Sequence, residues 1–257
     1  MSRLKLINFR DMGGLSTPNG PIRRGKIFRT AIFHPRTRAD LRYIRDMHLD
    51  CVVDFRTKAE STEKPDRLPE GVRHINASIF GESDSNGIAP TTNAIRSFLR
   101  MTEEELNGVR EFVRRQYTEM PFSTGYRILF DLMDRGQTFA FHCTAGKDRT
   151  GVGAMLIEMA LGRTPEQCRV EYMRSNDCRA RETERICRLV ALVSRKPHVR
   201  RFARDMITVH EHLFDTAMEA IYARYPDVDT FLAECHGVTP ARRARWVQTY
   251  VDAGDTD

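Results

Sequence analysis

The sequence lacks any run of about 18 apolar residues, so no transmembrane helix is expected. Residues 1–10 are polar and do not contain the apolar segment of a secretory signal peptide. Internal repeats and low-complexity tracts are also missing. We therefore expect a chain that is cytoplasmic as synthesised, and export by a route that reads no N-terminal signal stays open.

Cysteines are few, and their spacing forms no pairs. The six cysteines, at positions 51, 143, 168, 178, 187 and 235, include no Cys-x-x-Cys motif. This spacing argues against structural zinc held by cysteines. A chain of 257 residues with six cysteines is also not a disulfide scaffold, so we expect reduced thiols.

Charged residues are common, and basic residues outnumber acidic ones. There are 41 basic and 35 acidic residues, which gives a net charge of +6 and suits an anionic ligand such as phosphate, nucleic acid or acidic lipid. Basic runs at 195–201 and 242–245 lie on predicted helices, where a solvated helix face is the favoured interpretation. We therefore expect no nucleic-acid partner, while peripheral contact with a membrane stays open.

Short β-like runs alternate with helical segments before residue 143. The candidate strands are 26–29, 49–55, 72–77 and 138–142, and Asp40 is expected to cap a helix between the first two. Strands separated by helices predict an α/β fold with a mainly parallel central sheet flanked by helices. We expect one domain over residues 1–257.

Helices dominate the rest of the chain. Thr102 and Glu105 form a capping box at the start of a helix within an insertion of about 91–120. This insertion is either a lid over the functional site or a plain packing helix, and the sequence does not separate the two. Further helix starts at Thr164 and Thr239, each followed by proline, predict a helical C-terminal region over about 180–253.

A Cys-x5-Arg pattern occurs twice, and only one copy has a context suited to anion binding. Cys168 and Arg174 enclose no glycine and lie in a predicted helix, whose amides cannot surround an anion, so this copy is assigned to chance. Cys143 and Arg149 instead follow a buried-looking strand and lead into an apolar helix.

The loop at Cys143 is typical of a phosphate site. A strand, a tight turn and a helix N-terminus aim backbone N–H groups and the positive helix end at one point. This field favours the thiolate of Cys143, the form that acts as a nucleophile, and the planar fork of Arg149 can bind two phosphate oxygens. The expected phosphate-binding residues are Thr144, Ala145, Gly146, Lys147 and Arg149.

Residues 142–151 resemble the active-site loop of the cysteine-based protein tyrosine phosphatases, in the bacterial subgroup with His-Cys-x-x-Gly-Lys-Asp-Arg. Three further segments are similar to that subgroup. They are Asn-Phe-Arg-Asp-Met-Gly-Gly at 8–14, Asp-Phe-Arg-Thr-Lys-Ala-Glu at 54–60 and Glu-Tyr-Met-Arg-Ser-Asn at 171–176. The loop and the segment at 8–14 are the specific parts of this resemblance, which in outline covers most of the chain.

The resemblance implies the phosphatase fold and hydrolysis of phosphate monoesters through a phosphocysteine intermediate, with no metal and no cofactor. It also implies substrates beyond phosphotyrosine, namely phosphoserine, phosphothreonine and phosphoinositides. Lys147 places a second cation beside Arg149, which suits highly charged inositol headgroups. The favoured function is a protein tyrosine phosphatase with dual or lipid specificity. The alternatives are a phosphoinositide phosphatase with incidental protein activity and a non-catalytic phosphate-binding module.

Several candidates exist for the general acid that protonates the leaving group. Asp148, inside the loop, is preferred as acid and later base, Asp54 at the end of a strand is second, and Asp84 is third. Thr150 is expected to help the thiolate leave in the second step, and His142 to orient the loop backbone.

Two further interpretations concern the segments outside the loop. Arg10 and Asp11, with the glycines that follow them, are expected to build a turn that packs against the loop. Arg56 and Glu60 are expected to form a local ion pair.

Overall fold

A five-stranded sheet lies at the centre of the computed structural model, which describes residues 6–35, 37–81 and 97–252. Its strands, in the order β1-β4-β7-β5-β6, are β1 (Arg10–Asp11), β4 (Ile27–Thr30), β7 (Phe139–His142), β5 (Cys51–Asp54) and β6 (Arg73–Asn76). The last four pair in parallel, and β1 pairs with β4 antiparallel. A separate ribbon consists of β2 (Ser16–Thr17) and β3 (Gly20–Pro21). The predicted mainly parallel sheet is confirmed.

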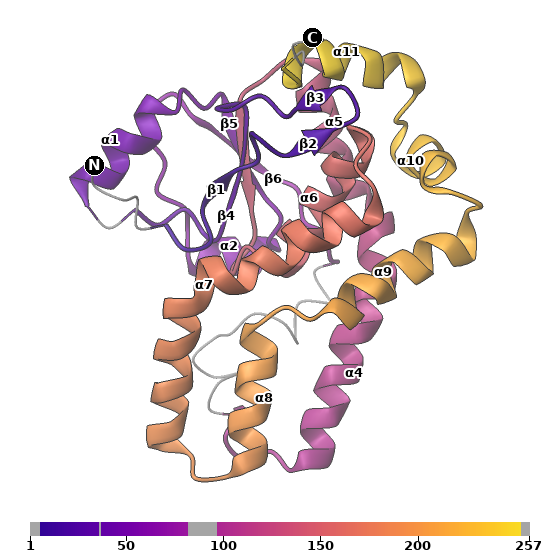
Figure 1. Ribbon diagram of the computed structural model, residues 1–257. Coiled ribbons are helices and arrows are strands. Elements are labelled where there is room, and N and C mark those ends of the chain that lie inside the picture. Colours follow the sequence, from indigo (N-terminus) through magenta and orange to yellow (C-terminus); the bar gives the residue numbers. More distant parts are fainter. Residues whose placement is uncertain (1–5, 36, 82–96, 253–257) are drawn as a thin grey trace.

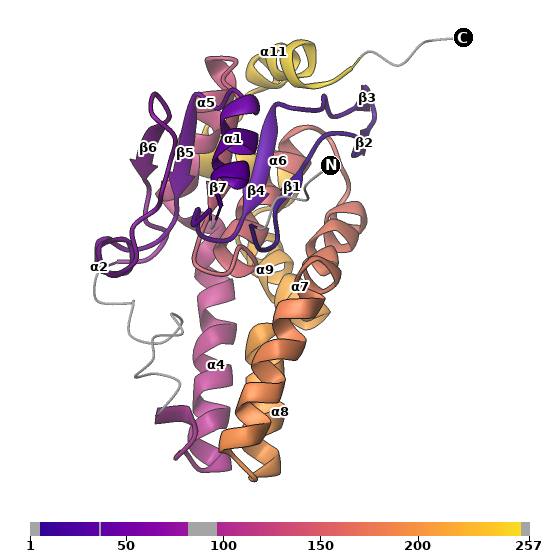
Figure 2. The same ribbon diagram turned by 90° about the vertical axis from the view of Figure 1, so that its left-hand side faces the viewer.

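Side chains of the sheet alternate between two hydrophobic layers, as the period of a strand requires. Val52 and Ala140 pack on one face with Ile44 of α1 (Arg38–Asp46). The other face, which includes Val53 and Phe141, packs against the helices α5 (Arg127–Asp134) and α6 (Asp148–Ala160). Figures 1 and 2 show the helices on both sides of the sheet. Because β5 and β7 are covered on both faces, they read in the sequence as continuous buried runs.

The predicted cap of α1 is wrong by three residues. Thr37 is the N-cap, and its side chain accepts a hydrogen bond from the backbone N–H of Asp40. The Asp40 carboxylate in turn accepts from the N–H of Thr37, which completes a capping box. Asp40 therefore occupies the third helical position, where its short side chain reaches back to the cap.

The other capping predictions are confirmed. Thr102 caps α4 (Glu103–Glu119) and Thr239 caps α11 (Pro240–Tyr250). Thr164 caps α7 (Pro165–Val193), a helix of 29 residues that includes both Cys168 and Arg174. The second Cys-x5-Arg pattern thus lies within a regular helix, as expected.

Three helices form an arm that extends past the ends of the strands (Figures 1 and 2): α4, α7 and α8 (Pro197–Ile207). The arm has its own small hydrophobic cluster, made by Leu106, Val190, Val199 and Phe202. The remaining elements are α2 (Lys58–Glu63), the 3-10 turns η2 (Met120–Phe122) and η3 (Thr124–Tyr126), α9 (Glu211–Arg224) and α10 (Val228–His236). Among the described residues, even the longest helix is too polar to cross a membrane.

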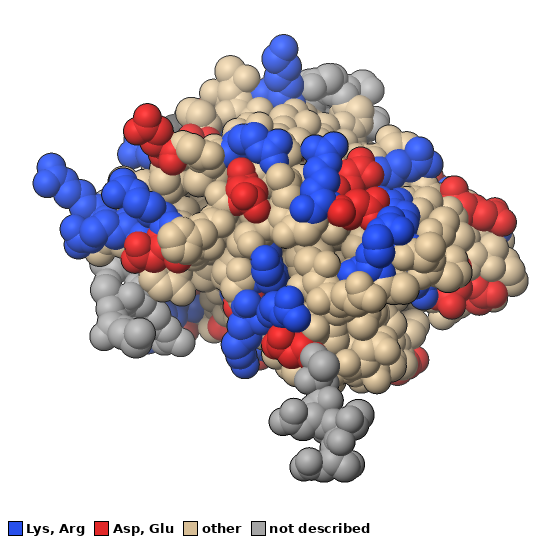
Figure 3. Space-filling model, turned by 90° about the horizontal axis from the view of Figure 1, so that it is seen from above, with Lys and Arg blue, Asp and Glu red and all other residues tan. Residues whose placement is uncertain are grey.

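Basic and acidic side chains are interspersed on the face seen from above in Figure 3. On α11, which lies at the top of Figure 1, Arg242 pairs with Asp134 at 2.7 Å and Arg243 pairs with Asp229 at 2.7 Å. These ion pairs with neighbouring helices compensate the positive charge of the run at 242–245, as expected for an ordinary exposed helix face.

The core behind α6 should dominate stability. Leu156 is fully buried in that helix, whereas Leu192, near the end of α7, is 82% exposed. Leu156→Ala should lower the free energy of unfolding by about 2–5 kcal/mol, because it removes apolar contacts and leaves a cavity. The matched substitution Leu192→Ala should change it by less than about 0.5 kcal/mol. Urea denaturation of both variants measures the difference, and equal effects would contradict the placement of α6 in the core.

Candidate active site

The residues predicted to bind phosphate lie in the loop between β7 and α6, at the carboxyl ends of the parallel strands. Cys143 directly follows β7, and Arg149 lies in the first turn of α6. Ligands of open α/β sheets bind at this edge, where loops converge and helix N-termini point outward. Cys143 is 2% exposed and Arg149 is 3% exposed, so both lie beneath the surface.

Gly146 has a backbone that only glycine fits. Its φ angle is +68°, and a Cβ atom there would lie 2.4 Å from the carbonyl oxygen of Thr30. This close approach lets Asn8 Nδ2 donate a hydrogen bond of 2.7 Å to the Gly146 carbonyl, and Arg29 Nη2 donates a second at 3.2 Å. Two buried side chains thereby fix the direction of the Gly146 carbonyl.

Two other carbonyls of the loop are held in the same way. The Thr144 carbonyl accepts from the N–H of Ile32 at 3.3 Å, and His142 Nδ1 donates to the Cys143 carbonyl at 3.0 Å. The N–H groups of residues 144–147, by contrast, donate to no other group within the described part of the chain. A loop with bonded carbonyls and free amides offers donors to an anion and turns acceptors away from it.

Arg149 is held by a carboxylate from the neighbouring segment. Its Nη1 and Nη2 atoms donate to the two oxygens of Glu60 at 2.7 and 2.9 Å, and Thr144 Oγ1 donates to the same carboxylate at 2.9 Å. Burial alone would raise the pKa of Glu60, but the hydrogen bonds from Arg149 outweigh it and hold the pKa below the usual value. The ring of Phe80 lies 5.5 Å from the guanidinium. Glu60 therefore fixes one edge of the Arg149 fork.

This contact corrects the expected local pair between Arg56 and Glu60. Arg56 Nη2 donates to Asp54 at 2.7 Å and to Asp66 at 2.8 Å, so its partners lie on β5 and in the segment before β6. Glu60 caps α2 from its first turn and faces Arg149. The prediction was wrong because the spacing of four residues spans the turn before α2 rather than one helix face.

Asp148 is buried in a network of donors. Tyr117 of α4 donates to Asp148 Oδ1 at 2.6 Å, and Lys147 Nζ donates to the same oxygen at 3.0 Å. The Tyr172 hydroxyl lies 2.7 Å from that of Tyr117. Burial would raise the pKa of Asp148, but the charge of Lys147 and the Tyr117 hydrogen bond hold it below the usual value. Asp148 is thus an ionised acceptor in this arrangement, and its role as acid stays a prediction.

Lys147 and Thr150 lie beside the loop as expected, with different surroundings. Lys147 is 7% exposed and, besides Asp148, contacts the carbonyl of Thr208 at 3.2 Å. Thr150 Oγ1 is buried and makes no hydrogen bond to any other described residue, so its role toward the sulfur stays a prediction. Asp84 and residues 91–96 of the expected insertion lie outside the described residues. The lid role of this insertion stays a prediction.

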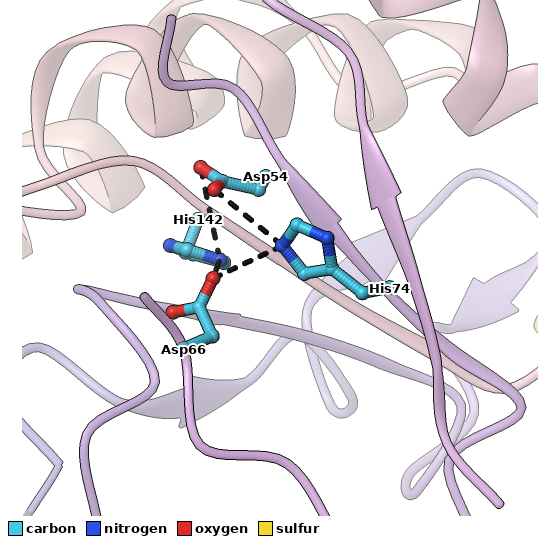
Figure 4. A group of neighbouring side chains, drawn as sticks. All are labelled: Asp54, Asp66, His74 and His142. Carbon is cyan, nitrogen blue, oxygen red and sulfur yellow. Dashed lines mark hydrogen bonds and ion pairs between the residues drawn. The ribbon is translucent and has the colours of Figure 1, made fainter. Parts of the chain in front are cut away.

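His142 and Asp54 belong to a cluster behind the loop, shown in Figure 4. Asp54, Asp66, His74 and His142 bring one donor atom each to within 4.8 Å of one another. Hydrogen bonds to Asp54 and Asp66 raise the pKa of His74 to about 9. Burial would raise the pKa of both carboxyls, but the neighbouring histidines and Arg56 hold it below the usual range. Asp54 is completely buried in this cluster.

The N-terminal segment holds the loop in place and is not placed to bind a ligand. This agrees with the expectation that Arg10 and Asp11 build a turn that packs against the loop. Arg10 Nη1 donates to Asn8 Oδ1 at 2.6 Å, and Arg10 Nε donates to Glu171 at 2.5 Å. Asp11 accepts from the N–H groups of Gly13 and Gly25, both at 2.8 Å, and so closes the turn. The side chain of Asn8 is thereby oriented toward Gly146.

Sequence reasoning did not foresee the roles of Glu60, Tyr117, Asp66 and His74. Glu60 carried a signal, since it ends the segment 54–60 that resembles the phosphatase subgroup. Tyr117, on the buried face of α4, looked like an ordinary core residue. The roles of Asp66 and His74 could not be predicted from the sequence, because their partners lie on other strands at no regular sequence spacing.

Sequence comparison places these features in context. The tyrosine phosphatase family matches residues 2–252 of this chain. A protein of Cupriavidus necator whose name assigns it to the tyrosine-protein phosphatases is 29% identical over 241 residues, which cover 91% of this chain and 83% of that protein. The triple specificity protein phosphatase PtpB of Mycobacterium tuberculosis is 28% identical over 203 residues, which cover 70% of this chain and 71% of PtpB.

Solved structures are more distant. TpbA of P. aeruginosa in complex with pTyr has 15% sequence identity and a TM-score of 0.30, covering 61% of this chain and 72% of its own. The Orf virus tyrosine phosphatase OH1, described as displaying triple substrate specificity, has 14% identity and a TM-score of 0.23, covering 93% and 91%. Scores this low carry no argument, so the family assignment depends on the sequence match.

Replacement of Glu60 tests the role assigned to its carboxylate. Glu60→Gln keeps a side chain that can complete the helix cap but removes the charge that holds Arg149. Because a misplaced guanidinium loses its alignment with phosphate, kcat/KM for an aryl phosphate should fall on the order of 10²-fold. Glu63→Gln, the same change at an exposed position of α2, should have no effect. Wild-type kcat/KM in Glu60→Gln would refute the assignment.

Proposed function

The chain belongs to the tyrosine phosphatase family and is a cysteine-dependent phosphatase, and we propose that Cys143 is its nucleophile and Arg149 its principal phosphate ligand. The observation that carries this proposal is the polarity of the loop. The carbonyls of Thr144 and Gly146 accept hydrogen bonds from Ile32, Asn8 and Arg29, while the amides of residues 144–147 have no partner in the part of the chain that the structure describes. A phosphate dianion beside Cys143 would receive these amides as donors.

The contacts of Arg149 support a role in phosphate binding. Glu60 takes one N–H from each Nη atom, and the Phe55 carbonyl accepts from Nη1 at 3.4 Å. A guanidinium has five N–H groups, and Arg149 Nε is buried with no partner among the described residues. Arg149 thus keeps Nε and one Nη2 hydrogen for two parallel bonds to phosphate oxygens, the geometry that makes arginine a bidentate ligand.

The first chemical step transfers the phosphoryl group to sulfur. The Cys143 thiolate attacks phosphorus, an S–P bond forms, and the P–O bond to the leaving group breaks. The charge that shifts onto the phosphoryl oxygens meets the loop amides and Arg149, which are fixed before the reaction begins. The leaving oxygen takes a proton from a general acid, for which Asp148 is our first candidate. Since Asp148 is ionised in the arrangement described above, this role requires that it be protonated when the substrate is bound.

The second step releases phosphate. Water attacks phosphorus after losing a proton to the carboxylate of Asp148, the S–P bond breaks, and sulfur leaves as thiolate. The buried hydroxyl of Thr150, which has no other partner in the described structure, donates a hydrogen bond to the departing sulfur. Both steps use side chains of this chain alone, without a metal or cofactor.

We further propose phosphotyrosine as the main substrate class, with activity toward phosphoserine and phosphothreonine or toward phosphoinositides. The name of the similar protein PtpB, triple specificity protein phosphatase, supports a broad range. Lys147 is the residue that would bind a second phosphate of an inositol headgroup. Because its ammonium contacts Asp148 and Thr208, that use requires Lys147 to exchange these partners for the ligand.

Loss of the proposed nucleophile should abolish turnover and leave binding. Cys143→Ser replaces the thiolate by a hydroxyl that is not ionised, so hydrolysis of a phosphotyrosine peptide should fall by at least about 10³-fold. The loop amides and Arg149 remain, so the same peptide should still bind, as calorimetry would show. Phosphoserine peptides and a phosphoinositide headgroup, assayed with the wild-type protein, rank the substrate classes.

The matched control is Cys178→Ser, which changes an exposed cysteine of α7 and should keep full activity. Turnover in Cys143→Ser comparable to wild type would eliminate the phosphocysteine mechanism. Wild-type protein that binds phosphotyrosine but turns over none of the substrates would instead indicate a phosphate-binding module.

The general acid can be identified by comparing how much its replacement slows the hydrolysis of phosphate esters with different leaving groups. Asp148→Asn should slow hydrolysis of an alkyl phosphate by about 10²–10⁴-fold, because an alkoxide must be protonated as it leaves. An aryl phosphate with an acidic phenol needs little protonation and should be affected much less. Asp54→Asn should reduce both rates alike, through its position behind the loop. A steeper leaving-group dependence in Asp54→Asn than in Asp148→Asn would reverse the assignment.

A further inference from the structure

The cluster behind the loop contains the donor atoms of a metal site. Figure 4 shows four side chains that converge from separate segments: Asp54 on β5, Asp66 between α2 and β6, His74 on β6 and His142 at the end of β7. We propose that these four residues bind one Zn²⁺ ion. This site lies outside the proposed reaction and does not depend on it.

The hydrogen bond of His142 presents the correct nitrogen to the cluster. Its Nδ1 lies 3.0 Å from the carbonyl oxygen of Cys143, which can only accept, so Nδ1 carries the hydrogen. In the neutral ring, Nε2 then has a lone pair directed into the cluster. Metal-binding histidines nearly always donate their other N–H to a carbonyl or carboxylate in this way.

His142 Nε2 is also a buried polar atom in need of a partner. The side chain is completely buried, and Nε2 makes no hydrogen bond within the described structure. It lies 3.2 Å from Asp66 Oδ2 and 3.9 Å from Asp54 Oδ1, which are acceptors themselves. A cation beside Nε2 and Asp66 Oδ2 would give His142 the partner that it lacks, since a buried polar atom left alone costs about 1–3 kcal/mol.

The spacing of the donors suits tetrahedral zinc. Zn–N and Zn–O bonds of about 2.0–2.1 Å place neighbouring ligand atoms of a tetrahedron roughly 3.3–3.4 Å apart. His74 Nε2 lies 3.1 Å from Asp66 Oδ2 and 3.5 Å from Asp54 Oδ2. His142 Nε2 lies 3.2 Å from the same Asp66 Oδ2, so these three separations lie within about 0.3 Å of that geometry. Two imidazoles favour zinc over calcium and magnesium, which prefer oxygen ligands.

Arg56 holds the carboxylates without using their full capacity. Its N–H and Nε donate to Asp54 Oδ1 at 2.9 and 2.8 Å, so that oxygen is fully used. Its Nη2 donates to Asp54 Oδ2 at 2.7 Å and to Asp66 Oδ2 at 2.8 Å, and each of these two oxygens has a second lone pair. With both imidazoles neutral, as metal ligation requires, two carboxylates and one guanidinium leave a net negative charge for a cation.

The cluster is reachable from solvent on one side. The His74 side chain is 38% exposed, while the other three are buried. A surface cavity of about 430 Å³, lined by Asp66 and His74 together with residues 68–72, opens over these two ligands. A metal ion can therefore enter past His74 without opening the core of the sheet.

Zinc at this position would act on the neighbouring loop through His142. The ion would fix the ring of His142, whose Nδ1 holds the carbonyl of Cys143. The expected consequence is a more rigid connection between β7 and the loop, rather than participation in phosphoryl transfer.

Calorimetric titration of ZnCl₂ into full-length, chelator-treated Cys143→Ser protein tests the site, because this background removes the reactive thiol as a competing ligand. We expect one Zn²⁺ per chain and a rise in Tm on binding. Adding His74→Gln should weaken affinity more than about 100-fold, since loss of a ligand exceeds the 10–100-fold cost of disturbing its supports. No binding, or equal binding with His74→Gln, would overturn the proposal.

The control replaces a second pair of neighbouring histidines, His210 and His212. The rings of His210 and His212 stack with centroids 5.4 Å apart, so they could hold zinc adventitiously. His210→Gln with His212→Gln should leave the zinc affinity unchanged, and a loss of binding there would overturn the proposal. X-ray absorption of the zinc-loaded Cys143→Ser protein needs no further variant: it should show nitrogen and oxygen ligands only, and a sulfur shell would assign the metal to a cysteine.

Discussion

The outward hydrogen bonding of the loop carbonyls is the constraint on which the site depends. Gly146 can bring its carbonyl to Asn8 and Arg29 only because its φ is +68° and it has no Cβ to collide with Thr30. Turning that carbonyl toward the anion would break two buried hydrogen bonds, at a cost of about 1–3 kcal/mol for each group left unsatisfied. The positive potential around Cys143 is therefore built into the backbone before any ligand arrives, as electrostatic preorganisation requires.

The bonds that hold the loop come from segments far apart in the sequence, which explains why the similar segments at 8–14 and 171–176 accompany the loop motif. Arg10 of β1 connects Asn8 to Glu171 and Ser175 of α7. Arg29 is completely buried; its burial and the nearby Arg10 lower its pKa, while the charge of Glu171 opposes this. Such a buried ionic network adds little net stability, because desolvation offsets its attraction. Its value here is positional, since it fixes Asn8 and α7 relative to Gly146.

Local patterns predicted much of the fold and the loop, because those features depend on neighbours in the sequence. The buried runs of β5 and β7 and the caps at Thr102 and Thr164 need only a few adjacent residues. Long-range partners were not predictable in this way. Glu60 was assigned to Arg56 by spacing, yet it faces Arg149, 89 residues away. The register of the parallel sheet, which places Asp54 beside both His142 and Asn76, is equally invisible to a local pattern.

His142 joins two environments of opposite character. On one side its backbone leads into a loop of free N–H donors, and Nδ1 holds the Cys143 carbonyl. On the other side Nε2 faces two buried carboxylates that Arg56 and His74 keep ionised. Because an imidazole is rigid, any cation that draws Nε2 toward the carboxylates also moves Nδ1 and, with it, the carbonyl of Cys143. The ring of His142 is thus a direct connection between the carboxylate cluster and the backbone of Cys143.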